Sequence, residues 1–243
     1  MTQTITNYTL YLADNALILG QRNSAWCGHG PVLEQDIAIT NISLDLIGQA
    51  RSFYQYAAEL TGNGATEDSL AYLRTEREFK NVLLAEQPNG DWAQTILRQF
   101  FFSTYQFYLY QALVNHPDTR IAAIAEKSLK EVSYHLRWSS EWVIRLGDGT
   151  EESNRRLHKA LEALWCYTGE LFMPADFEAG IDLVALKKDW STKVKTILEE
   201  ATLTVPENVF MHSGGKAGNH TEHMGFILTE LQYMQRAYPN SEW

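Results

Sequence analysis

Long stretches of helical periodicity, separated by short breaks, are the feature that most constrains the fold of this chain. Its 243 residues include only six prolines and fifteen glycines, and these cluster between the periodic stretches. In residues 32–60, for example, apolar side chains recur at steps of three, four or seven, as they do on a helix. Strand signals are nearly absent, since no hairpin dipeptide stands between alternating apolar and polar residues. The sequence therefore predicts an all-α protein.

Four of the predicted helices are long enough to form a bundle: residues 8–22, 32–60, 92–115 and 117–146. Residues 68–86 are predicted as a connecting helix in the middle of this series, and Asp91 as the N-cap of the helix after it. Shorter helices over 151–172, 182–202 and 221–237 would pack outside. Two long helices, a connection and two more long helices is the ferritin-like order. With no internal linker, residues 1–243 are expected to form a single ferritin-like four-helix bundle with additional C-terminal helices.

Composition and charge exclude several classes of partner. Apolar residues make up 45% of the chain and charged residues 21%, which is typical of a soluble globular protein. The net charge of −10 and the lack of any run of Lys or Arg longer than two residues argue against nucleic acid or an anionic membrane surface as partner. Cys27 and Cys166 form no C-x-x-C pattern, and neither a signal peptide nor a membrane span is evident. A cytoplasmic location is therefore expected.

The residues that would bind a di-iron centre in such a bundle are missing. That centre needs a Glu from each of two helices and a Glu-x-x-His pair from each of the other two. None of the seven histidines has Glu or Asp three residues before it, so the chain contains no Glu-x-x-His. Between Asp91 and Asp118 there is no carboxylate at all, so the helix over 92–115 offers no acidic ligand. The sequence predicts the frame of a di-iron protein with no metal bound by this chain.

Two other combinations of residues leave a metal site open as an alternative. Glu131 and His135 stand four residues apart and can share a helix face, although one carboxylate and one imidazole cannot bind two irons. His220 and His223, with Glu222 between them, are possible zinc ligands with no evident third partner. The alternative hypothesis is an independent metalloenzyme with an unrecognised site.

Five longer strings in the chain are unusual enough to compare with known families: WCGH at 26–29, LDLIGQAR at 44–51, REFKN through EQPNGD within 77–91, YHLR at 134–137 and HTEH at 220–223. They resemble the family of non-catalytic, ferritin-like C subunits of phenylacetyl-CoA epoxidase. The similarity extends from about residue 7 to Trp243. The resemblance implies a structural subunit of a multicomponent monooxygenase of aerobic phenylacetate catabolism. That complex epoxidises the aromatic ring of phenylacetyl-CoA with dioxygen and NADPH.

The resemblance also implies partners and site residues. The expected partners are a related catalytic A subunit that contains the di-iron cofactor, a small B subunit and a reductase with flavin and an iron–sulfur centre. Where a catalytic relative reads Asp-Glu-x-x-His, this chain reads DLIGQ at 45–49 and EVSYH at 131–135. The degenerate metal-site positions are therefore Leu46, Gln49, Val132 and His135. Contacts to the CoA substrate are expected from Glu78, Phe79, Lys80 and Asn81. A further alternative is an interaction protein for another ferritin-like oxygenase.

Aromatic residues crowd the helix predicted over 92–115. Seven of the eleven residues from 100 to 110 are aromatic: Phe100, Phe101, Phe102, Tyr105, Phe107, Tyr108 and Tyr110. They cover more than one face, which excludes a simple surface helix. Two interpretations remain open: a helix buried inside its own bundle, or a helix with one face in an obligate subunit interface.

Overall fold

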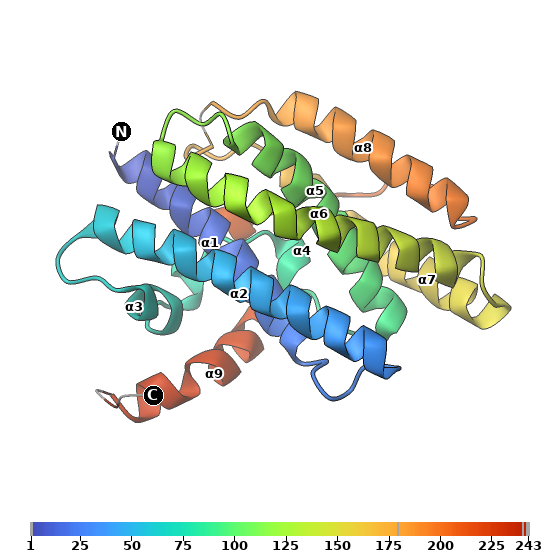
Figure 1. Ribbon diagram of the computed structural model, residues 1–243, viewed down its shortest axis with the longest axis horizontal. Helices are drawn as coiled ribbons and strands as arrows, with labels where there is room; N and C mark the ends of the chain where they lie inside the picture. Colours follow the sequence, from blue (N-terminus) through green and yellow to red (C-terminus); the bar gives the residue numbers. More distant parts are fainter. Residues whose placement is uncertain (1, 179, 240, 242–243) are drawn as a thin grey trace. The chain divides into compact units, whose positions relative to one another are not determined.

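The computed structural model describes residues 2–178, 180–239 and 241. All regular secondary structure in this part of the chain is helical, so the all-α prediction is confirmed. The chain divides into two compact units. Figure 1 shows the ribbon coloured by position in the sequence. The first comprises Met1–Glu86, Ala175–Ala179 and Gly214–Trp243, and the second comprises Gln87–Pro174 and Gly180–Ser213. That they form a single domain stays a prediction.

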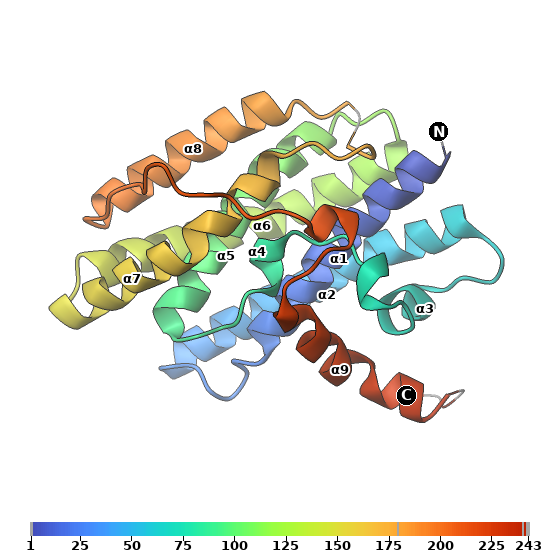
Figure 2. The same cartoon turned by 180° about the vertical axis from the view of Figure 1, so that it is seen from behind.

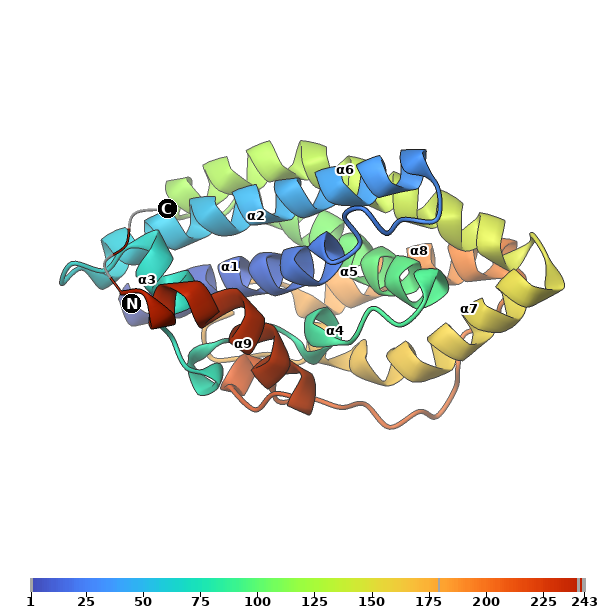
Figure 3. The same cartoon turned by 90° about the horizontal axis from the view of Figure 1, so that it is seen from below.

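The first unit is built on an antiparallel pair of long helices, α1 (Thr2–Ser24) and α2 (Leu33–Thr61), which lie side by side in Figures 1 and 3. Their contact is close because Gly20 has no side chain: an added Cβ would stand 3.3 Å from Leu46 Cβ and from Ile47 Cγ1. Ile18 and Ile39 are among the fully buried residues of this pair. The C-terminal helix α9 (Glu222–Ala237) packs against α3 (Glu67–Tyr72) and α1.

The prediction of a continuous connecting helix over 68–86 is wrong. The segment contains α3, a 3₁₀ turn η1 (Glu76–Glu78), an extended stretch and the single-turn helix α4 (Leu83–Glu86). Phe79 is extended, with φ −74° and ψ 150°. The backbone N–H groups of Lys80 and Val82 donate to the side chains of Asp14 and Asn15 in α1, at 2.8 and 3.0 Å. These bonds to α1 replace the bonds that a helix would make within the segment.

The second unit is built on the antiparallel pair α5 (Trp92–Leu113) and α6 (Thr119–Gly147). Asp91 caps α5 as predicted, since its carboxylate accepts from the N–H of Gln94 at 3.1 Å. The helix α7 (Glu151–Leu164) is followed by 3₁₀ turns η2 (Trp165–Tyr167) and η3 (Gly169–Phe172), so the helix predicted over 151–172 is shorter than expected. Both α7 and α8 (Leu183–Glu200) pack on α5.

The aromatic residues of α5 are mostly interior. Phe100, Phe101, Phe102, Tyr105 and Tyr110 are buried, whereas Phe107 and Tyr108 are partly exposed. The indole N–H of Trp190 in α8 donates to the Phe101 carbonyl at 2.9 Å, which ties α8 to the middle of α5. The burial favours the first interpretation of this helix, a central core element of its own unit. No helix in the described part of the chain is long and apolar enough to cross a membrane.

Candidate functional site

The four positions predicted to be a degenerate metal site are buried on two helices. On α2, Leu46 is fully buried and Gln49 is 2% exposed, one turn further along. On α6, Val132 and His135 are both fully buried and also one turn apart. Burial at this spacing is what inward-facing ligands of a bundle would need. Leu46 and Val132 have no donor atom, however, and the other two positions offer only an amide and an imidazole.

The other two long helices, α1 and α5, offer few further side chains that could bind a metal. Helix α5 contains no carboxylate, and the only carboxylate of α1 is Asp14. Asp14 is fully buried and already accepts from Arg74, from the Tyr54 hydroxyl at 2.5 Å and from the Lys80 N–H at 2.8 Å. A di-iron centre needs four carboxylates and two imidazoles, so these residues do not fit one.

Asp14, Arg74 and Tyr54 form a buried cluster in the first unit. The Arg74 guanidinium bonds both carboxylate oxygens of Asp14 and lies 4.1 Å from the centre of the Phe79 ring. Burial alone would lower the pKa of Arg74, but the charge of Asp14 outweighs it and the pKa is raised. Burial and the same carboxylate raise the pKa of Tyr54. The cluster therefore holds one positive and one negative charge, with a neutral phenol between α1 and α2.

The segment 78–81 is anchored to this cluster and to a second buried carboxylate. Glu78 is exposed and caps η1 by accepting from Thr75, which lowers the pKa of Glu78. Phe79 and Asn81 are fully buried, and the Asn81 amide donates to Glu86 at 3.0 Å. Lys80 is half-buried, with its ammonium 5.6 Å from the Phe177 ring centre. Among the four predicted CoA contacts, Glu78 and Lys80 are thus the accessible ones.

Glu86 is the centre of the second buried group. One oxygen accepts from the N–H and hydroxyl of Thr221 at 2.6 and 2.7 Å, and the other faces His220 Nδ1 at 2.7 Å. His220 Nε2 faces the Phe79 carbonyl at 3.1 Å. Because both ring nitrogens face acceptors, the geometry favours the doubly protonated imidazolium. Burial would lower the pKa of His220, but the hydrogen bond to Glu86 and its charge outweigh it and raise the pKa.

Sequence reasoning did not identify either buried group. One signal was available: Asp14 is the only charged residue among 1–21, a largely apolar helix, and a buried carboxylate needs a partner. The partner could not be found because Arg74 is sixty residues away and resembles a solvated cation of a helical face. His220, a possible zinc ligand in the sequence, is committed to Glu86. In the described part of the chain, no three His, Cys, Asp or Glu side chains are grouped to hold a metal.

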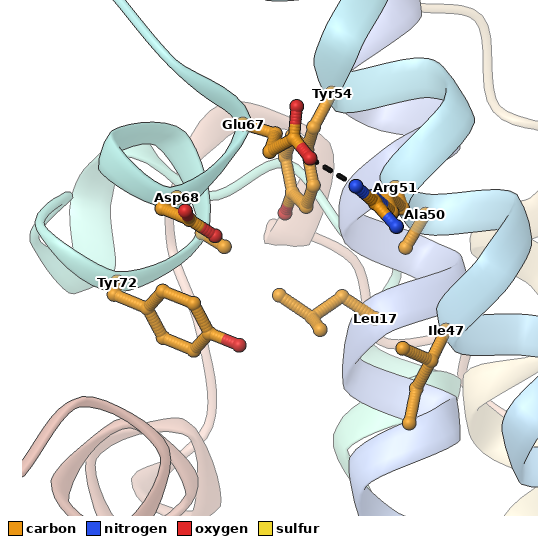
Figure 4. A pocket seen from close by; sticks show the side chains of 9 residues that line it. Leu17, Ile47, Ala50, Arg51, Tyr54, Glu67, Asp68 and Tyr72 are labelled. Atoms are coloured by element: carbon orange, nitrogen blue, oxygen red, sulfur yellow. Dashed lines mark hydrogen bonds and ion pairs between the residues drawn. The ribbon is translucent and has the colours of Figure 1, made fainter. Parts of the chain in front are cut away.

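A cavity of about 220 Å³ lies between α1, α2 and α3, and Figure 4 shows its lining. Arg51 of α2 and Glu67 of α3 form an ion pair at 2.9 Å on one side, with Asp68 and Tyr72 on the other. Burial and the Asp68 charge raise the pKa of Tyr72. The volume is below the roughly 300 Å³ at which small-molecule sites begin, so a ligand the size of CoA does not fit.

The buried ion pair generates a first prediction. Arg74→Met should lower the free energy of unfolding by about 3–5 kcal/mol, because the Asp14 carboxylate is left buried without its cation. Arg77→Met, three residues away and exposed, should change stability by less than about 0.5 kcal/mol. Urea denaturation of the two variants measures the difference. The double variant Asp14→Leu, Arg74→Met should recover part of the loss, and a further loss instead would contradict the assigned cause.

His220 generates a prediction about pH. Its folded-state pKa is raised above the ordinary 6.5, so its stabilising contribution is complete below pH 6.5 and is lost as pH rises through the raised value. His220→Gln should lower stability at pH 6 by about 1.5–3 kcal/mol and remove this part of the pH dependence. Thermal unfolding from pH 6 to 9 measures both effects. His223→Gln is the control and should keep the wild-type profile; an unchanged profile in His220→Gln would refute the assignment.

Comparison with known proteins identifies the family of this chain. The whole chain, residues 1–243, matches the family described as phenylacetic acid catabolic protein. It is 46% identical over 246 aligned positions to the C subunit of 1,2-phenylacetyl-CoA epoxidase from Escherichia coli strain K12, covering 98% of this chain and 99% of that protein. An identity of this size over the full length of both chains shows common ancestry and a common fold. This chain belongs to the phenylacetic acid catabolic protein family.

Proposed function

We propose that this protein is the C subunit of a 1,2-phenylacetyl-CoA epoxidase, a structural component without chemistry of its own. The observation that carries the proposal is the 46% identity to the corresponding Escherichia coli protein over 98% of the chain. Its role is to stabilise and position a catalytic A subunit that contains the di-iron cofactor. A small B subunit and an NADPH-dependent reductase complete the complex, which works in aerobic phenylacetate catabolism in the cytoplasm.

The buried residues support a non-catalytic role. The positions that would present carboxylates hold Leu46 and Val132, and the one carboxylate of α1 is bound to Arg74. Leu46 and Val132 therefore contribute to packing, and the carboxylate of α1 contributes to an internal ion pair, so none of them is available to bind a metal. When bound in the partner subunit, the two irons supply the dioxygen chemistry. This chain contributes a surface that binds the catalytic subunit. The Lys80 ammonium contributes a positive charge that pairs with the phosphates of CoA.

An exposed apolar stripe on α2 supplies the surface that such a subunit needs. Leu33, Ile37, Leu44 and Ile47 are 72%, 52%, 61% and 39% exposed. Together with Thr40 they follow spacings of four, three, four and three residues, the pattern of a seam between packed helices. Gly48 stands beside this α2 stripe, and a Cβ placed there would meet nothing within 4 Å. A glycine inside a helix costs about 1 kcal/mol, and here it lets another backbone approach closely. We assign the α2 stripe to a helix of the catalytic subunit.

The proposal predicts that Leu44→Glu weakens assembly. A charge in the middle of the α2 stripe would be buried without a partner, which weakens association by at least about tenfold. Val184→Glu on α8 is the matched control, because Val184 is 82% exposed and apolar but lies outside the α2 stripe. Co-purification of each variant with the catalytic subunit, followed by turnover of phenylacetyl-CoA, measures the effect. Equal recovery of both complexes would exclude the α2 stripe as the contact.

The non-catalytic role has a separate test. The purified chain should contain far less than one equivalent of iron or zinc by elemental analysis, because its buried positions lack the carboxylates. His135→Gln, measured per assembled complex, should leave epoxidation nearly unchanged. One tightly bound equivalent of metal, or a loss of turnover in a complex that still assembles, would favour an independent metal site in this chain.

A further inference from the structure

A cavity in the second unit has no part in the function proposed above. Its volume is about 570 Å³, within the range of sites that bind small molecules. One wall is α8, another is the 3₁₀ segment from Trp165 to Phe172, and the third is the stretch 203–211. Figure 2 shows this stretch leaving the end of α8 and running back past the 3₁₀ segment. All three walls belong to the same unit.

The floor of the cavity is aromatic and fixed in position. The ring centre of Trp190 lies 5.9 Å from that of Trp165 and 5.3 Å from that of Phe172. The indole N–H of Trp190 is already used, because it donates to the Phe101 carbonyl at 2.9 Å. Trp165 and Trp190 are 8% and 3% exposed. A ligand would therefore meet preformed ring faces rather than polar groups that need partners.

The third wall is held at both ends of the stretch. The Leu203 N–H donates to the Leu198 carbonyl and the His212 N–H to the Cys166 carbonyl, both at 2.8 Å. Met211 packs on Gly169, where a Cβ would stand 2.6 Å from the Met211 Cγ. The stretch is thus attached to α8 at one end and to the 3₁₀ segment at the other. Between these attachments it contributes Leu203, Val205 and Met211 to an apolar wall.

The rim carries a cation that has no counter-ion of its own among the described residues. Lys195 stands 3.8 Å from Glu199, one turn further along α8. Lys187 also lines the cavity, is exposed, and forms no ion pair with any residue that the structure describes. It lies one turn before Ser191, with Trp190 between them, and all three line the cavity from α8. The part of α8 that lines the cavity therefore offers an ammonium and a hydroxyl beside the Trp190 ring.

We propose that this cavity binds an apolar monocarboxylate, with its hydrocarbon body on the rings of Trp165 and Trp190 and its carboxylate at Lys187 and Ser191. Apolar atoms leave water for the ring faces and the wall at Leu203. The carboxylate forms charge-assisted hydrogen bonds with the ammonium and accepts from the hydroxyl. Glu207 also lines the cavity and would repel a carboxylate placed beside it, whereas Glu199 and Lys195 are paired with each other.

Calorimetric titration of the full chain with octanoate and with 1-octanol tests the proposal. Lys187→Met should weaken octanoate binding about threefold to tenfold and leave 1-octanol binding unchanged, because only the acid pairs with the ammonium. Lys188→Met is the matched control, since Lys188 is an exposed neighbour in α8 that does not line the cavity. Ser191→Phe, which places a ring in the mouth of the cavity, should abolish the binding of both ligands. Circular dichroism confirms that each variant is folded.

Three outcomes would overturn the proposal. The first is no heat of binding with octanoate at millimolar concentration at either about 10 °C or about 35 °C, two temperatures being needed because apolar burial releases little heat near 25 °C. The second is binding of octanoate by Ser191→Phe or Lys187→Met as tightly as by the wild type. The third is octylamine that binds more tightly than octanoate, with the preference lost in Glu207→Gln, which would assign the cavity to a cation instead. The assembly tests on α2 do not depend on any of these results, because α2 lies in the other unit.

Discussion

The ion pair between Asp14 and Arg74 is the interaction on which the organisation of the first unit depends. A carboxylate in the interior of α1 is tolerated only with a cation and hydrogen-bond donors around it. The chain from Leu73 to Val82 supplies them: the Arg74 guanidinium, and then the Lys80 N–H. In a continuous helix, the N–H groups of this stretch would donate to carbonyls of the same helix and could not reach α1. The chain is extended at Phe79 because its backbone serves α1, and α4 then places Glu86 where His220 and Thr221 meet it.

The long helices could be predicted from the sequence because each bears its own periodic pattern and end signals. Asp91 and Asp182 cap α5 and α8, and glycine follows α2 at Gly62. The connecting segment could not be predicted in this way. Its residues are good helix formers, and what overrides them is a set of acceptors on α1 more than sixty residues away. The local sequence pattern of the segment does not indicate a hydrogen bond to residues so far away in the chain.

The candidate site was predictable in part for a related reason. The loss of metal ligands is a statement about residue types at fixed spacing, and spacing can be read without coordinates. Leu46 and Gln49 are buried on α2, and Val132 and His135 are buried on α6; that they correspond to one metal site stays a prediction. The role of Asp14 could not be predicted in this way, because a single acid in an apolar helix can be either a metal ligand or one member of an ion pair. Only the position of Arg74 distinguishes the two.

The two faces of α2 are under different physical constraints. Its inner face buries Leu46, Phe53 and Tyr54 within this unit. Its outer face leaves Leu33, Ile37 and Leu44 largely in water and accepts a glycine at Gly48, neither of which stabilises the isolated chain. Apolar exposure on a regular seam becomes favourable only when a second helix covers it. The two faces therefore suit the proposed subunit: the inner face packs within this unit, and covering the outer face with a partner helix would lower the free energy of the assembled state.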